Sequence, residues 1–160
     1  MGHYERIHEF ESDLNCTELR MGIVMSRYNI DASKGLLDSC TKEFEKNGVP
    51  SSNILMITVP GALEIPLALQ KMALTDQFDA LVALGAVIRG GTYHFEIVSK
   101  ESASGITAVQ LDTGIPVVNS ILTTETNEQA LERMSQKGAE AARAAIEMVY
   151  LLRKLDEVIQ

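Results

Sequence analysis

The sequence is poor in the residues that build metal centres and disulfide frameworks. It contains only two cysteines, Cys16 and Cys40, and they are too far apart to form a metal-binding motif. We expect both to act as small apolar residues rather than to form a disulfide. No segment resembles a zinc-ligand cluster, a phosphate-binding P-loop or a nucleophile elbow. The sequence therefore predicts no metal site.

Positive charge and long apolar runs are also scarce. Lys and Arg number 14 against 22 Asp and Glu, for a net charge of −8, which argues against nucleic acid and anionic membranes as partners. No apolar run is long enough to span a bilayer. The N-terminal residues 1–15 are polar and acidic, without the basic start and apolar core of a signal peptide. We therefore expect a cytoplasmic protein.

The remaining composition is that of one globular domain. The chain has 160 residues, of which 46% are hydrophobic and 22% are charged. A chain of this length can bury about 70% of the surface that it exposes when unfolded, so it needs no covalent cross-links. We expect an N-terminal tail over residues 1–15 and a single domain over residues 16–160, because no linker, repeat or low-complexity tract follows.

Four apolar runs alternate with helical patterns along this domain. The predicted strands are residues 21–25, 54–59, 80–88 and 115–122, and the predicted helices are 31–46, 63–74, one that ends at 113–114, and 127–157. Four β-then-α units predict an α/β fold: a three-layer α/β/α sandwich with a four-stranded parallel sheet in flavodoxin-like order. Such sheets bind ligands beyond the carboxyl ends of their strands, which here are residues 26–29, 60–64, 88–94 and 123–125.

The segment after the third predicted strand carries the most chemical information. Gly90 and Gly91 allow a sharp turn, and the helix that follows offers free amides to an anion such as phosphate. Thr92 can cap that helix or bind a phosphate oxygen. His94 falls in its first turn, where a helix N-terminus favours the neutral imidazole that accepts a proton before donating it. The alternative is an ordinary strand-to-helix turn with a structural or solvated histidine.

Polar residues near the other strand ends and on the last helix have two interpretations each. Glu64 either complements a helix dipole or accepts hydrogen bonds from a polyol. Tyr28 either stacks on a planar heterocycle or packs under a loop. Arg133 and Lys137 belong either to a solvated helix face or to a phosphate site, which an acidic protein must supply with cations.

Four motifs give these residues a family context. Residues 26–29 read SRYN, 59–66 read VPGALEIP, 85–94 read GAVIRGGTYH and 123–133 read TTETNEQALER. In their order and spacing they resemble the signature motifs of the lumazine synthase family, and the resemblance extends from about residue 20 to residue 153. One such motif is weak support, but four in register are specific.

The resemblance implies a reaction that uses neither metal nor cofactor. The family condenses two small molecules, 5-amino-6-(D-ribitylamino)uracil and 3,4-dihydroxy-2-butanone 4-phosphate, to 6,7-dimethyl-8-ribityllumazine, and releases phosphate and water. By this resemblance His94 is the proton donor, and Gly91, Thr92 and Arg133 hold the phosphate with help from Lys137.

The resemblance also implies a site shared between subunits. The family builds each site between neighbours in a pentamer, so we expect a homo-oligomer built from pentamers in which Arg133 and Asn119 come from the adjacent chain. Tyr28 would stack on the pyrimidine. The remaining expected contacts are to the ribityl chain, from Ala62, Leu63 and Glu64, and to the pyrimidine, from the backbone of Ala86, Val87 and Ile88.

Two departures from the family pattern affect these expectations. Asn119 stands where the best-known members have phenylalanine, so it can hydrogen-bond the edge of a heterocycle but cannot stack as well. The segment after Arg133 is shorter than in capsid-forming members, so we expect one nearly continuous C-terminal helix and a pentamer or a pair of pentamers rather than a capsid. The alternatives are a flavin-binding module or a shell-forming homologue without catalysis.

Overall fold

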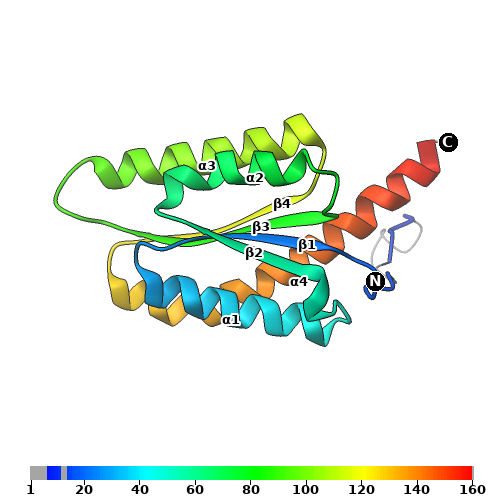
Figure 1. Ribbon diagram of the computed structural model, residues 1–160, viewed down its shortest axis with the longest axis horizontal. Coiled ribbons are helices and arrows are strands. Elements are labelled where there is room, and N and C mark those ends of the chain that lie inside the picture. The colour runs from blue at the N-terminus through cyan, green and yellow to red at the C-terminus, as the bar shows by residue number, and fades with distance from the viewer. Residues whose placement is uncertain (1–6, 12–13, 160) are drawn as a thin grey trace.

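A four-stranded parallel sheet in the order β2-β1-β3-β4 forms the centre of the protein (Figure 1). The structure is a computed structural model that describes residues 7–11 and 14–159. Its elements are β1 (Met21–Ser26), α1 (Ile30–Lys46), a 3₁₀ turn η2 (Ser51–Asn53), β2 (Ile54–Val59), a 3₁₀ turn η3 (Ala62–Glu64), α2 (Ile65–Ala73), β3 (Ala80–Ile88), α3 (His94–Thr113), β4 (Val117–Thr124) and α4 (Asn127–Ile159). The predicted α/β/α sandwich and flavodoxin-like strand order are confirmed.

Two helices cover each face of the sheet. Helices α1 and α4 lie on one face, and α2 and α3 lie on the other (Figure 1). Every residue of the central strand β3 except Ile88 is buried. Its alternate side chains enter the two cores: Leu81 and Ala83 pack on the α2 and α3 side, and Val82 and Leu84 on the α1 and α4 side. Burial on both faces explains why this strand reads as an uninterrupted apolar run.

The fourth strand begins later than predicted. Residues 115–122 were expected, whereas β4 runs from Val117 to Thr124. Pro116 has no N–H to pair, and only its carbonyl joins the ladder by accepting a hydrogen bond from the Leu81 amide at 2.9 Å. Pairing with β3 then continues to Ile88↔Thr124, so the predicted loop residues 123 and 124 belong to the strand.

The second predicted helix is divided. Residues 63–74 were expected as one helix, but a 3₁₀ turn at Ala62–Glu64 precedes the α-helix, which begins at Ile65. The Glu64 amide donates to the Gly61 carbonyl at 3.2 Å, a bond of the tighter 3₁₀ type. Pro66 lies in the first turn of α2, as predicted, where its missing N–H leaves no hydrogen bond unmade.

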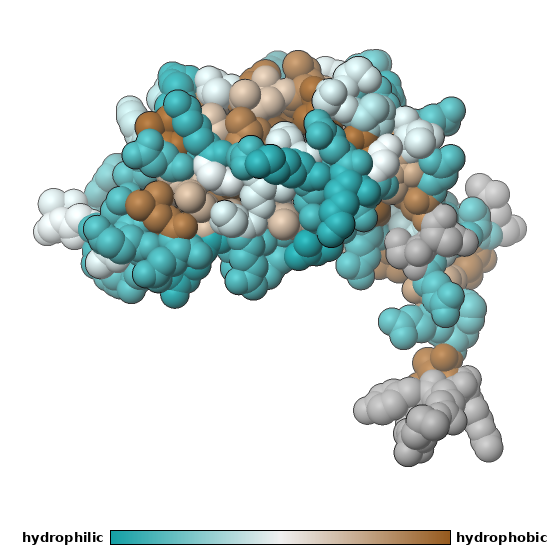
Figure 2. All heavy atoms as spheres, turned by 90° about the horizontal axis from the view of Figure 1, so that it is seen from below, coloured by the Kyte–Doolittle hydropathy of each residue, from teal (hydrophilic) through white to brown (hydrophobic). Residues whose placement is uncertain are grey.

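The C-terminal helix α4 is continuous, as predicted, and crosses α1 at very close range. A Cβ atom added at Gly138 would lie 2.4 Å from the Leu36 carbonyl oxygen, so only glycine fits at this crossing. The Ser39 hydroxyl donates to the Ser135 carbonyl across the same contact. Figure 2 views the protein from the α1 and α4 side, where polar side chains cover most of the surface.

Both cysteines act as apolar core residues, as expected. They are free and buried, and burial raises the pKa of the Cys40 thiol to about 12. Of the predicted tail, residues 1–6 and 12–13 lie outside the described residues. Among the helices of the described chain, none combines the length and apolar character needed to cross a membrane.

We predict that Gly138→Ala lowers the free energy of unfolding by about 1–3 kcal/mol, as overpacking typically does. At an unhindered position inside a helix, a glycine-to-alanine change would instead raise the free energy of unfolding by up to about 1 kcal/mol. Gly90→Ala is the matched control, because no atom lies within 4 Å of a Cβ there, and it should change stability by less than about 0.5 kcal/mol. Urea denaturation at one chain concentration measures both, and a stabilised Gly138→Ala protein would contradict the close crossing.

Candidate active site

The chain leaves β1 in a segment that presents an aromatic ring at the carboxyl edge of the sheet. The Tyr28 amide donates to the Pro60 carbonyl at 3.1 Å, which holds the end of β1 beside the end of β2. The Tyr28 ring lies on Gly61, where an added Cβ would come within 2.8 Å of a ring carbon. The side chain is nevertheless 68% exposed. One face of the ring is therefore supported and the rest is open to solvent, an arrangement that suits stacking.

Asn29 ties this segment to the central strand. Its backbone is left-handed, with φ 58° and ψ 51°, and its side-chain Nδ2 donates to the Ala86 carbonyl at 2.9 Å. No individual role was predicted for Asn29 from the sequence. The available signal was an asparagine, which tolerates left-handed backbone, directly between a strand and a helix. Asn29 joins two strand ends at the switch point between β1 and β3.

The Glu64 carboxylate caps its own turn. Its Oε2 accepts a hydrogen bond from the Gly61 amide at 3.0 Å. Ala62 is buried and Leu63 is exposed, so these two residues differ in what they can offer a ligand. The capping contact agrees with the first of the two interpretations of Glu64, and it uses only one of the two carboxylate oxygens.

The loop between β3 and α3 is the most exposed part of the candidate site. Residues 89–94 are all exposed, and His94 is the first residue of α3, as predicted. Of the two roles considered for Thr92, the helix cap is not observed: Tyr93 occupies the N-cap position without a side-chain cap, and the Thr92 hydroxyl only accepts a long, 3.4 Å hydrogen bond from the His94 amide. The Glu96 amide donates to the Tyr93 carbonyl at 3.1 Å, so among the first three amides of α3 only that of Phe95 makes no hydrogen bond within the described residues and is available to an anion.

Asn119, Arg133 and Lys137 lie together at a different place. They line a hollow of about 410 Å³ beside the edge strand β4, together with residues 120–125 and Gln129. None of the candidate residues that follow β1, β2 and β3 lines this hollow. Within one chain, Arg133 and Lys137 therefore form a group separate from the candidate residues that follow β1, β2 and β3, whereas Asn119 also lines a hollow with Tyr93 and Glu96 at the start of α3.

The polar groups around this hollow already have partners within the chain. Arg133 donates to the Gln129 carbonyl at 2.9 Å, and the Lys137 ammonium lies 2.9 Å from a Glu140 carboxylate oxygen. Hydrogen bonding to Lys137 lowers the pKa of Glu140, which favours the charged form of this carboxylate. The Asn119 Oδ1 accepts from the Ile121 amide at 3.0 Å, along the free edge of β4.

Across residues 7–11 and 14–159, no three His, Cys, Asp or Glu side chains are grouped so that they could hold a metal ion.

Comparison with known proteins agrees with the motifs. The sequence model of the family described as 6,7-dimethyl-8-ribityllumazine synthase matches residues 18–153. A protein of that name from Nitrosospira multiformis is 67% identical over 160 residues, which is the full length of both chains. Its counterpart from an Azoarcus species is 61% identical over 155 residues, covering 97% of this chain and 99% of its own. The Nitrosomonas europaea protein is 56% identical over 160 residues, covering 100% of this chain and 98% of its own.

The chain belongs to the 6,7-dimethyl-8-ribityllumazine synthase family. The resemblance drawn from the four motifs is thus confirmed, and the chain is an enzyme of riboflavin biosynthesis. The family match spans all four β-then-α units, so both groups of candidate residues fall inside it.

We predict that Asn29→Asp lowers the free energy of unfolding by about 1–3 kcal/mol, because a carboxylate oxygen would then face the Ala86 carbonyl without a hydrogen between them. Asn29→Gly should cost only about 0.5–1.5 kcal/mol, since glycine keeps the left-handed backbone and removes the donor alone. Denaturation of both variants tests the order of these effects. Equal stability of Asn29→Asp and the parent protein would show that the side chain does not secure β3.

Proposed function

We propose that the chain condenses 5-amino-6-(D-ribitylamino)uracil with 3,4-dihydroxy-2-butanone 4-phosphate, and that His94 supplies and removes protons in this reaction. The supporting observation is the position of His94, exposed in the first turn of α3 and directly beyond the carboxyl end of the central strand. The 5-amino nitrogen attacks the ketone carbon, and loss of water gives an imine. Phosphate then leaves, and the ribitylamino nitrogen closes the ring with loss of a second water.

The pyrimidine substrate would bind at the ends of β1, β2 and β3. Tyr28 offers an exposed ring that packs on Gly61, and the backbone of residues 86–88 offers polar groups at the end of β3. The ribityl chain would lie along residues 62–64, where the uncapped oxygen of Glu64 accepts from its hydroxyls. Holding two reactive substrates together provides much of the acceleration in such a site.

The phosphate of the second substrate would bind at the start of α3, between Gly91 and Thr92 on one side and Arg133 and Lys137 on the other. Free helix amides and cationic side chains are the groups that bind phosphate in proteins. Arg133 and Lys137 are both about half exposed, at 51% and 49%, so they are accessible to a ligand beside the edge of β4.

We propose that the two groups of residues meet between subunits, in a pentamer. The separation of the groups within one chain supports this arrangement, because a single chain leaves each half of the site without the other. Large apolar side chains are exposed on α2 and α3, including Leu67, Ile97 and Leu111, and these surfaces suit contact with another chain. With Asn119 in place of the family's phenylalanine, this side of the site would hydrogen-bond the pyrimidine instead of stacking on it.

Two further expectations belong with this proposal. A flavin-binding module in this fold would carry a Ser-, Thr- or Gly-rich loop after β1, whereas Arg27, Tyr28 and Asn29 occupy that loop, so catalysis is favoured. We place the enzyme in the cytoplasm, where two free buried thiols remain reduced.

His94→Ala should lower turnover by about 10²-fold or less and leave substrate binding largely intact. General acid–base residues typically contribute about 10²–10⁴-fold, but the approximation of two reactive substrates survives the change. His8→Ala is the control, because that histidine lies before the domain's first strand. Steady-state formation of the lumazine, followed by its absorbance, measures both variants. Unchanged turnover in His94→Ala would remove this residue from the mechanism.

Arg133→Ala should weaken use of the butanone phosphate by about 1.5–3 kcal/mol, the usual contribution of a hydrogen bond to a charged group. The pyrimidine should bind almost as before. Arg143→Ala is a matched control on the same helix, since its partner is Glu43 on α1 at 3.1 Å. Equal weakening of both substrates by Arg133→Ala would indicate a structural role instead.

Mixing the His94→Ala and Arg133→Ala chains tests the shared site. If each site takes His94 from one chain and Arg133 from its neighbour, random mixing at equal amounts restores about a quarter of the sites. A site contained in one chain would gain no activity on mixing.

Light scattering on the parent protein should give a mass five or ten times that of the 17.5 kDa chain. A sixty-fold mass would show that the short segment after Arg133 does not limit assembly.

A further inference from the structure

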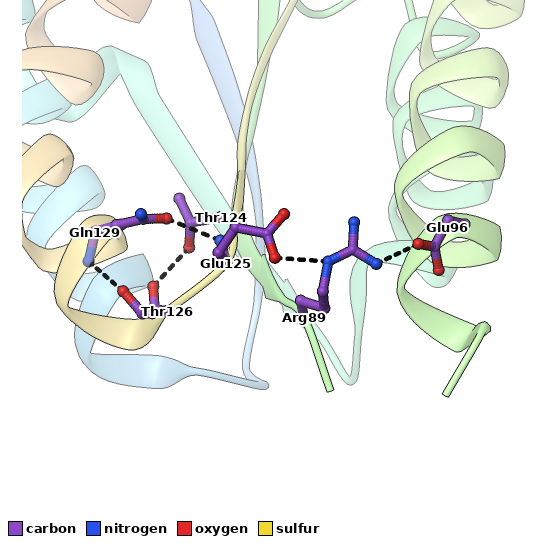
Figure 3. Close-up of polar contacts among 6 residues, drawn as sticks. All are labelled: Arg89, Glu96, Thr124, Glu125, Thr126 and Gln129. Atoms are coloured by element: carbon purple, nitrogen blue, oxygen red, sulfur yellow. Dashed lines mark hydrogen bonds and ion pairs between the residues drawn. The ribbon is translucent and has the colours of Figure 1, made fainter. Parts of the chain in front are cut away.

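The Arg89 side chain forms a bridge between two parts of the candidate site (Figure 3). Its Nε donates to Glu125 at 2.6 Å, and its Nη1 donates to Glu96. The guanidinium also lies over the ring of Phe95, with Cζ 4.3 Å from the ring centroid. Arg89 is the first residue after β3, Glu96 lies in the first turn of α3, and Glu125 is the first residue after β4.

The loop that Arg89 spans has little else to hold it. Residues 89–94 are all exposed, and an added Cβ at Gly90 or Gly91 would meet no atom within 4 Å. The loop is therefore not packed against neighbouring side chains along these glycines. At its start, the Arg89 amide donates to the Thr124 carbonyl at 2.9 Å, which extends the β3–β4 ladder by one residue. At its end, the Arg89–Glu96 contact closes the loop.

The acidic partner on the other side is itself fixed to α4. The Glu125 amide donates to the Gln129 side chain at 2.9 Å, and the Gln129 amide donates to the Thr126 hydroxyl at 3.2 Å. These contacts and the bond between Thr124 and Thr126 appear together in Figure 3. The Gln129 carbonyl in turn accepts from Arg133. A continuous series of polar contacts thus runs from the start of α3 to Arg133.

The contact between Arg89 and Glu96 favours the charged forms of both groups. The hydrogen bond from Arg89 lowers the pKa of Glu96, and the hydrogen bonds to Glu96 and Glu125 raise the pKa of Arg89. A planar guanidinium can donate to two carboxylates at fixed angles, which a lysine ammonium does less well.

We propose that Arg89 is a positioning residue, which holds the 90–94 loop against the start of α4 by bridging Glu96 and Glu125. Its effect on the reaction rests on the function proposed above for His94 and Arg133, but the bridge itself does not. The guanidinium is turned to two carboxylates of its own chain and not to a phosphate. It sets the relative position of the loop and Arg133, which belong to two neighbouring sites in the proposed pentamer.

The first test measures the loop directly, without the reaction. In Arg89→Met, amide hydrogen exchange in the peptides that cover residues 90–94 and 125–129 should become roughly 3- to 10-fold faster, as expected for loss of exposed ion pairs. Arg89→Lys should lie between the parent and Arg89→Met. Lys42→Met is the matched control, because it removes the basic partner of an exposed ion pair with Asp38 on α1 and should leave both peptides unchanged. Unchanged exchange in Arg89→Met would overturn the proposal.

The second test separates positioning from direct contact with substrate. If Arg89 acts through its two carboxylates, Glu96→Gln and Glu125→Gln should each lower kcat/KM for the butanone phosphate by roughly 3- to 10-fold, and Arg89→Met by about 10- to 100-fold. The double variant Arg89→Met/Glu96→Gln should be no worse than Arg89→Met alone. Unchanged or raised kcat/KM in both glutamine variants would mean that they free the guanidinium for phosphate, and this would overturn the proposal.

The two tests fail separately. An inactive parent protein would overturn the proposed function, while the exchange measurement would still decide whether Arg89 holds the loop. An active parent with unchanged exchange and unchanged kinetics in Arg89→Met would leave the function standing and remove Arg89 from it.

Discussion

Burial of β3 on both faces is the constraint from which the position of the site follows. A central parallel strand that is covered by helices on both sides has no free face to offer a ligand. Only its carboxyl end reaches solvent, where Ile88 is partly buried and every residue from 89 to 94 is exposed. The neighbouring strands end at the same edge. The Asn29 side chain donates to the Ala86 carbonyl on β3, and the Arg27 amide donates to the Val59 carbonyl at the end of β2. The packing of the core thus restricts the active site to the carboxyl edge of the sheet, whichever residues carry out the reaction.

The candidate residues divide at the edge strand β4. Those after β1, β2 and β3 lie at strand ends that hydrogen bonds join, and those on α4 line the hollow beside β4. The Arg89 bridge is the polar connection that joins them within a chain, through Glu125 and Gln129. In the proposed pentamer these two groups serve different sites, so each chain would set the geometry of two active sites at once. A change in the loop after β3 would then alter the geometry of a neighbouring site that does not contain this loop.

The elements could largely be predicted from the sequence, because the apolar runs are clean and the turn residues are specific. The β3 strand was placed at its observed bounds, and the end of α3 was placed at Gly114, whose φ of 73° only glycine adopts easily. The start of β4 was placed wrongly, because residue 115 is apolar but the ladder begins only after Pro116. Asn29 and Arg89 were not assigned roles, since their function lies in contacts with residues 57 and 36 positions away, which periodicity cannot reveal. The division of candidate residues into two groups is likewise a property of three-dimensional packing.

The bond between the Asn119 side chain and the Ile121 amide has a consequence for how copies of this chain can join. Edge strands with unpaired N–H groups act as templates for strand addition, which leads to open-ended aggregation. On β4 the Asn119 Oδ1 occupies the outward N–H of Ile121, so a strand from another chain cannot pair there without displacing it. A second chain that approaches this edge must therefore be recognised through its side chains. Asn119 is thus both a wall of the hollow and a block to strand pairing at Ile121.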